Sequence, residues 1–271
     1  MTRAEDRGRI TYIGHATLLI EIGGLQILTD PNFDARLARV LPRVRLPGVA
    51  LRDLPALDAI LVTHAHADHL SLASLASLAS LAGLRSGGAK VPVFAPPPVA
   101  NWLRAMGHDA TAIGAGTTIS IGDVRIAAGP AAHAGTRYGI DWWRRASVTY
   151  LIESPSTSVF FAGDTGLVAA SHEMAHAWLE PQHRRLDVAL LPIGHAPWWK
   201  PRFRHGHLSS ADALTLFERL GARYMIPYHW GTFHHLTSGP YEAMYALRDL
   251  LADHPRRADV RIIEPGDTFD F

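Results

Sequence analysis

The stretch Thr63-His64-Ala65-His66-Ala67-Asp68-His69-Leu70 places three imidazoles and one carboxylate within six positions. Imidazole nitrogens and carboxylate oxygens are donors that zinc and other first-row metal ions bind in proteins. In extended backbone, residues two apart project to the same side, so we expect His64 and His66 to reach one ion together. Asp68 and His69 follow where the chain turns, which suits a second ion nearby. A solvated loop rich in histidine is the alternative interpretation.

Three further donors show the same local pattern, a polar residue that follows a short apolar run. His133 follows the run at 124–128, Asp164 follows 159–162, and His229 ends the run at 223–228. The candidate set then comprises five imidazoles and two carboxylates, namely His64, His66, Asp68, His69, His133, Asp164 and His229. Seven donors shared by two ions leave coordination positions open, whereas structural zinc sites are closed by four protein ligands each.

The elements that must position these donors are short strands and helices. Apolar and β-branched runs bounded by glycine, proline or serine turns predict strands at 10–15, 17–22, 25–29, 57–62, 91–94, 117–121, 124–128, 147–153, 158–162, 187–193 and 223–228. Helical patterns occur at 72–83, 99–106, 168–179, 210–220 and 241–252. In both halves, strands in meanders come first and then alternate with helices. This order predicts an α/β fold in which two stacked mixed sheets carry helices on their outer faces, in a single domain spanning residues 1–271.

The helix expected at 72–83 consists of a repeated Leu-Ala-Ser triplet ended by Gly83. At 3.6 residues per turn each triplet lags a full turn by about 60°, so the leucines drift around the helix. We therefore expect the helix to pack on the sheet at one end and loosely at the other.

Composition limits the classes of protein. The 271 residues are 48% apolar and 19% charged, which is typical of a soluble globular protein with a substantial core. No stretch approaches the roughly 18 to 20 apolar residues of a membrane span, and the charged N-terminus lacks an apolar signal segment, so we expect a cytoplasmic location. The absence of cysteine excludes disulfides, zinc-thiolate sites and thiol nucleophiles. A net charge of +1 disfavours a nucleic-acid partner, and the oligomeric state stays open.

The His-x-His-x-Asp-His signature at 64–69 is followed by His133, by Asp164 within the segment 160–166, and by His229. This order resembles that of the metallo-β-lactamase superfamily of binuclear metallohydrolases, from residue 12 to about 234. The flanking phrases look most like the branch of N-acylphosphatidylethanolamine-hydrolysing phospholipase D, with the ascorbate-6-phosphate lactonase branch next. Those phrases lie at 14–17, 28–33, 192–194, 201–203 and 229–233.

The resemblance implies the αββα sandwich and two metal ions with a shared hydroxide as the nucleophile. By position, the first ion is held by His64, His66 and His133, the second by Asp68, His69 and His229, and both by Asp164. Asp68 is also a catalytic candidate, because it can orient the attacking water. Two zinc ions are the first choice, and iron or manganese suits the same donors.

Further candidates surround these donors. His207 resembles a histidine that the phospholipase branch carries near the site, where it could protonate a leaving group or bind a phosphate; an ordinary surface histidine is the alternative. Arg137, four residues after His133, is a substrate-binding candidate. Five tryptophans next to ligand segments either wall an apolar substrate pocket or pack under loops, namely Trp142, Trp143, Trp198, Trp199 and Trp230.

The segment at 35–52 is cationic and apolar, and it contains no acidic residue. Its basic residues are Arg36, Arg39, Arg43, Arg45 and Arg52. Such a segment is compatible with contact to a phosphate or an anionic membrane surface. The alternative is a surface loop that covers the core with arginine stems.

A competing motif is His172-Glu173-Met174-Ala175-His176, which fits the helical pattern of zinc proteases. The sequence has no third zinc ligand at the spacing of those proteases, and the motif explains none of the other donors. We interpret it as a chance occurrence.

These observations predict a metal-dependent hydrolase that acts on a small-molecule or lipid-like substrate. A phosphodiester, including one that carries an acyl chain, is favoured by the flanking phrases and by the arginine-rich segment. A lactonase or other carboxylic ester hydrolase with the same centre is the alternative, and a metal-binding protein without catalysis is a more distant one.

Overall fold

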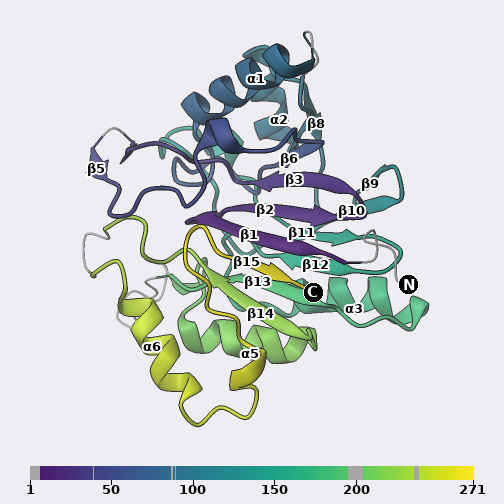
Figure 1. Ribbon diagram of the computed structural model, residues 1–271, viewed down its shortest axis with the longest axis vertical. Coiled ribbons are helices and arrows are strands. Elements are labelled where there is room, and N and C mark those ends of the chain that lie inside the picture. Colours follow the sequence, from purple (N-terminus) through teal and green to yellow (C-terminus); the bar gives the residue numbers. More distant parts are fainter. Residues whose placement is uncertain (1–6, 39, 87, 89, 195–203, 235–237) are drawn as a thin grey trace.

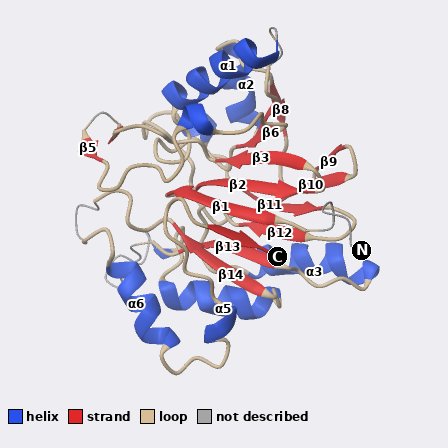
Figure 2. Cartoon of the chain, in the orientation of Figure 1, coloured by secondary structure: helices blue, strands red, loops and turns tan. Residues whose placement is uncertain are grey.

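The protein is described by a computed structural model that covers residues 7–38, 40–86, 88, 90–194, 204–234 and 238–271. Two mixed β-sheets lie face to face, with helices on their outer sides (Figures 1 and 2). This confirms the predicted sandwich, and the runs of strands followed by alternating strands and helices in each half explain why it forms.

The first sheet has the strand order β15-β1-β2-β3-β6-β7-β8. Its strands are β1 (Arg9–Gly14), β2 (Thr17–Ile22), β3 (Leu25–Thr29), β6 (Ala59–Leu61), β7 (Val93–Ala95), β8 (Ala110–Ala112) and β15 (Thr268–Asp270). The strands from β15 to β3 are antiparallel, and those from β3 to β8 are parallel. Because parallel neighbours need a crossover connection, α1 (Leu72–Ser86) joins β6 to β7 and α2 (Pro97–Ala105) joins β7 to β8.

The second sheet has the order β14-β13-β12-β11-β10-β9. Its strands are β9 (Thr118–Ile121), β10 (Val124–Pro130), β11 (Val148–Glu153), β12 (Ser158–Phe161), β13 (Val188–Pro192) and β14 (Tyr224–Tyr228). The strands β9 to β12 form an antiparallel meander, and β12, β13 and β14 are parallel. Its helices are α3 (Ala169–Leu179), α5 (Ser210–Leu220) and α6 (Glu242–Leu251).

The main hydrophobic core fills the space between the sheets and continues under α5 and α6, and a second core lies between the first sheet and the helices α1 and α2. Along α1, Leu75 and Leu78 are 1% and 3% exposed, whereas Leu84 is 82% exposed. This confirms the expected drift of its leucines. The helix runs to Ser86, beyond the predicted end at Gly83. Within the described ranges, no helix is long and apolar enough to cross a bilayer.

Several short elements were not predicted. The strands β8 and β15 have three residues each. The segment at 35–52, in which no strand was expected, contains a small hairpin of β4 (Arg36–Leu37) and β5 (Leu41–Pro42). The described residues also form the 3-10 helices η2 (Leu51–Asp53), η3 (Trp142–Arg144), η4 (Glu180–Gln182) and η5 (Arg257–Asp259). Elements of two or three residues are too short to show the hydrophobic period on which the predictions depend.

Candidate metal centre

All seven predicted metal donors follow strand ends and meet at one edge of the sandwich. His64, His66, Asp68 and His69 follow β6 of the first sheet. The second sheet supplies the other three, after β10, β12 and β14, namely His133, Asp164 and His229. Because β12 and β14 are parallel members of one sheet, their carboxyl ends lie at the same edge.

The first group of donors comprises His64, His66, His133 and Asp164, whose ligand atoms all lie within 4.8 Å of one another. His133 Nε2 is 3.1 Å from His66 Nδ1. The Nε2 atoms of His64 and His133 are each 4.0 Å from Asp164 Oδ2. Donors that share one tetrahedral ion at ordinary zinc distances are about 3.4 Å apart, so this spacing suits a single ion.

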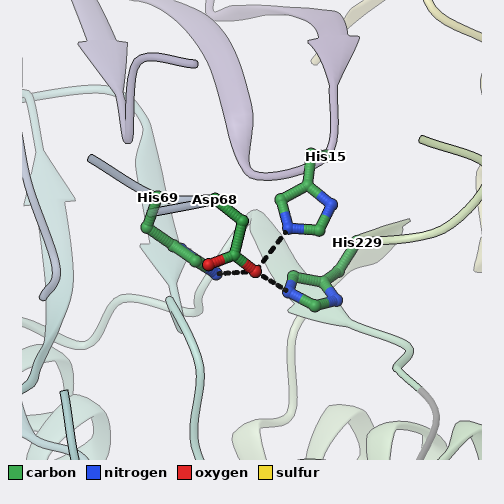
Figure 3. A group of neighbouring side chains, drawn as sticks. All are labelled: His15, Asp68, His69 and His229. Atoms are coloured by element: carbon green, nitrogen blue, oxygen red, sulfur yellow. Dashed lines mark hydrogen bonds and ion pairs between the residues drawn. The ribbon is translucent and has the colours of Figure 1, made fainter. Parts of the chain in front are cut away.

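The second group comprises His15, Asp68, His69 and His229 (Figure 3). Asp68 Oδ2 is 3.7 Å from His229 Nε2 and 3.9 Å from His69 Nε2. Asp164 also faces this group, because its Oδ2 is 3.2 Å from His69 Nε2 and its Oδ1 is 3.4 Å from His229 Nε2. Asp164 therefore lies between the two groups, where a shared ligand is predicted.

The residues of both groups fit divalent cations. The Nε2 atoms of His64, His69 and His229 are buried and have no hydrogen-bond partner in the part of the chain that the structure describes. A buried polar atom without a partner costs about 1 to 3 kcal/mol. A bound metal ion would use these lone pairs, so the geometry matches the predicted chemistry. The assignment of each donor to an ion stays a prediction.

Asp30 was missed by the sequence analysis, yet it holds His69 in place. Its Oδ2 is 2.7 Å from His69 Nδ1, and the backbone N–H and the hydroxyl of Thr63 donate to its two oxygens at 2.7 Å. A carboxylate on the second ring nitrogen fixes the tautomer and the orientation of a metal-binding histidine. Asp30 directly follows β3, so the rule that found Asp164 would also have found it.

Two other rings are fixed in a similar way. His64 Nδ1 is 2.9 Å from the Thr63 hydroxyl. His133 Nδ1 is 2.8 Å from the carbonyl oxygen of Gly206, to which it can donate. Each contact leaves Nε2 to face Asp164.

The charges of the site favour cations. Burial lowers the pKa of His64 and His229 well below the ordinary value and that of His133 to about 4. Burial would also lower the pKa of His69, but the charges of Asp164 and Asp68 raise it well above the ordinary value. Burial would raise the pKa of both these carboxyls, but the nearby imidazoles bring it well below its usual range. The carboxylates are therefore ionised at neutral pH.

The structure also brings His207 to the site. Its Nε2 lies 3.6 Å from Asp164 Oδ2, and its ring centroid is 4.8 Å from that of His133. Arg137 lies behind the ligand loop, where its Nη1 donates to the carbonyls of Leu70 at 2.6 Å and Ala65 at 3.3 Å. This guanidinium braces the loop, and its contact with substrate stays a prediction.

The five tryptophans differ in position. Trp142 and Trp143 lie on η3, after the loop of His133, and are 76% and 46% exposed. Trp230 is only 4% exposed, and its ring N–H donates to the carbonyl of Pro227 at 3.1 Å. Trp230 therefore packs in the core, as the alternative interpretation held. Trp198 and Trp199 lie outside the described residues.

Several arginines of the arginine-rich segment contact oxygen atoms of the protein itself. Arg43 donates to the carbonyls of Asn32 at 2.6 Å and Asp34 at 2.8 Å. Arg45 pairs with Glu264, and Arg52 lies 3.7 Å from Asp53. Arg36 is exposed, and Arg39 lies outside the described residues.

The competing motif lies on α3. His176 Nε2 is 2.7 Å from the carbonyl of Arg219, and its Nδ1 is 3.4 Å from Glu180. In the described ranges, no group of neighbouring metal donors includes His172, Glu173 or His176. The geometry agrees with a chance occurrence.

The chain belongs to the metallo-β-lactamase superfamily, because the family model described as a beta-lactamase superfamily domain matches residues 26–230. The fold, the two donor groups and this match together define a metal-dependent hydrolase.

Among relatives, the chain is 30% identical to a UPF0173 metal-dependent hydrolase of Methanopyrus kandleri, over 97% of this chain and 99% of that protein. It is 27% identical to N-acyl-phosphatidylethanolamine-hydrolyzing phospholipase D 1 of Caenorhabditis elegans, over 82% of this chain and 64% of the relative, so it spans less than two thirds of that protein. The solved structure of Igni18, a metallo hydrolase from Ignicoccus hospitalis, has a TM-score of 0.70 at 24% identity, with 98% of each chain covered.

The first prediction concerns Asp30. Asp30→Asn removes the charge that orients His69, and we expect metal affinity to fall about 10- to 100-fold. Asparagine tolerates the positive φ of 35° at this position. Asp34→Asn, which changes a nearby carboxylate that accepts from Ser71, is the matched control. Competition with a metal chelator measures both affinities, and equal values for the two variants would contradict the assigned role.

The second prediction follows from the raised pKa of His69. Because the pKa of His69 lies well above the ordinary value of an imidazole, the ring favours its protonated form, and a metal ion must displace that proton to bind Nε2. We expect metal loading of the apoprotein at pH 7 to release about one proton from this residue, and the apparent affinity to fall as the pH falls. Calorimetry in buffers of different ionisation enthalpy measures the release, and proton uptake on loading would be the opposite result.

Proposed function

We propose that this metal-dependent hydrolase uses two metal ions, zinc in the first place, and cleaves a phosphodiester, including one that carries an acyl chain. The observation that carries the proposal is the position of Asp164 between two groups of donors. Its oxygens lie 3.2 and 3.4 Å from imidazoles of the second group and 4.0 Å from two imidazoles of the first.

Two divalent ions, when bound, supply Lewis acidity and lower the pKa of a water molecule towards neutrality. The chain contributes the groups that handle protons around them. Asp68 is ionised, because its pKa lies well below the usual range, and it can orient the attacking water. His207 lies beside the shared carboxylate and can give a proton to the leaving oxygen.

Exposed apolar side chains in the segment after His133 support a substrate with an acyl chain. The segment that follows His133 exposes Tyr138 at 61%, Ile140 at 86% and Trp142 at 76%. The relative from Caenorhabditis elegans is named for the hydrolysis of such a lipid, and this supports the same substrate class here.

Contact with a membrane surface is supported by apolar side chains more than by charge. Val40 and Leu46 of the arginine-rich segment are 72% and 78% exposed. Arg43 and Arg45 in the same segment are bound to protein oxygens. This segment therefore suits contact with the apolar part of a lipid better than contact with an anionic headgroup alone.

The third prediction tests the reaction. Purified protein should contain two metal ions per chain and hydrolyse bis-p-nitrophenyl phosphate in preference to a homoserine lactone or nitrocefin. His66→Ala and Asp164→Ala should lose bound metal and activity, because they remove donors. Glu173→Gln, on α3 and outside both donor groups, is the control and should keep both.

Each other outcome has a defined meaning. Turnover of the lactone alone would replace the phosphodiesterase with the lactonase alternative. Two bound ions with no turnover of any substrate would favour a metal-binding protein. Two bound ions and full activity in Asp164→Ala would overturn the site itself.

The fourth prediction concerns His207 as a proton donor. His207→Ala should lower kcat about 10²- to 10⁴-fold on a dialkyl phosphodiester, whose leaving oxygen needs a proton. The loss should be much smaller with a p-nitrophenolate leaving group, which needs none. His205→Ala, at an exposed neighbouring position, is the matched control. Equal losses on both substrates would mean that His207 binds the phosphate and does not protonate the leaving group.

A further inference from the structure

We propose that His15 is a positioning residue for Asp68: its Nε2–H donates to Oδ2 and holds that carboxylate at the second metal position. The inference rests on the proposed two-metal function, and it adds a residue that lies outside the seven predicted donors. Four observations carry it.

The first observation is the conformation of the backbone. His15 lies in the tight connection between β1 and β2, with a φ of 57°. A left-handed conformation costs a non-glycine residue roughly 1 to 2 kcal/mol, and it persists only where the surroundings hold it. Here the backbone N–H of His229 donates to the carbonyl of His15 at 3.1 Å. The loop of a predicted ligand thus fixes the loop of His15.

The second observation is the packing of the ring. His15 is 3% exposed. Its ring centroid is 3.9 Å from that of His229 and 5.3 Å from that of Phe233, whose ring is inclined at 73° to the imidazole. Arg43 covers Phe233 at 4.9 Å from the ring centroid. The imidazole is therefore enclosed, and its direction is set.

The third observation is the distance to Asp68. Among the described residues, three imidazole nitrogens lie within 4.0 Å of Asp68 Oδ2, and His15 Nε2 is the nearest at 3.1 Å (Figure 3). This value lies within the usual range of N–H···O hydrogen bonds. The contacts of 3.7 Å from His229 and 3.9 Å from His69 are too long for hydrogen bonds. Their length instead suits donors that surround one ion.

The fourth observation is the position of His15 relative to Asp164. Five described imidazoles come within 4.0 Å of an Asp164 oxygen, namely those of His64, His69, His133, His207 and His229. Across the described residues, the ion pairs of His15 include Asp68 and not Asp164. His15 therefore contacts Asp68 and is not among the imidazoles that face Asp164.

A hydrogen bond to one carboxylate oxygen restricts rotation of the Asp68 side chain. Because the acceptor is ionised, the bond is also stronger than one between neutral groups. Asp68 then keeps one orientation when a metal ion or a water molecule approaches. This is the role that outer partners of metal ligands commonly have.

The fifth prediction compares His15→Gln with His15→Leu. Glutamine can place an N–H close to the position of Nε2, whereas leucine has a similar bulk and no donor. Neither is branched at Cβ, so the positive φ costs both a similar amount. The affinity of the second ion should fall about 10- to 100-fold in the leucine variant, and glutamine should recover most of it. The first ion should stay bound in both.

Three measurements on the whole protein test this. Chelator competition with metal analysis gives the affinity of each ion, the visible spectrum of the cobalt-loaded protein reports the coordination of the second site, and thermal unfolding of the apoproteins shows whether the variants fold equally well. A leucine variant that keeps wild-type affinity and spectrum would overturn the inference. Equal weakening in two equally stable variants would also overturn it and make His15 a direct ligand. Fewer than two ions in the wild-type protein would instead refute the proposed function.

Discussion

The structure depends on how the buried carboxylate of Asp164 is accommodated. This side chain is only 2% exposed, and a buried anion is costly unless opposite charge or hydrogen-bond donors surround it. Imidazoles from both sheets supply that environment, and the proton held by His69 supplies positive charge. A pair of cations would do the same more completely. The constraint explains why donors that are distant in the sequence converge on one edge of the sandwich.

Close backbone approach makes the convergence possible. A Cβ at Gly163 would lie 2.6 Å from Thr63 Cγ2, and a Cβ at Gly135 would lie 2.6 Å from His64 Cβ. Real Cβ atoms do not approach so closely, so glycine is needed at both positions. Gly163 also has a positive φ of 57°. These two glycines bring the loops after β10 and β12 against the loop after β6, and thus bring the two sheets together at the site.

The sandwich could be predicted from the order of the apolar runs, and so could the convergence of the seven residues that follow those runs. That these residues bind metal stays a prediction. His15 escaped because it lies within the strand predicted at 10–15, and Asp30 escaped because Asp30-Pro31 after the run at 25–29 is also typical of an ordinary turn. The position of Trp230 could not be predicted, since a tryptophan next to a ligand has the same local sequence whether it faces a pocket or the core. The role of Arg43 was hidden for a related reason: its two shortest hydrogen bonds go to backbone carbonyls, which any residue provides.

The hydrogen bond between the backbones of His15 and His229 joins residues 214 positions apart, from 15 to 229. It connects the turn between β1 and β2 to the end of β14. The two sheets are therefore linked by a backbone hydrogen bond beside the candidate metal centre. Ions bound at this centre would link the two sheets further, because their predicted ligands come from both. Their binding free energy would then add to the resistance of the whole sandwich to unfolding, in proportion to the logarithm of metal concentration. The free energy of unfolding, as well as the catalytic activity, would thus depend on the supply of metal ions.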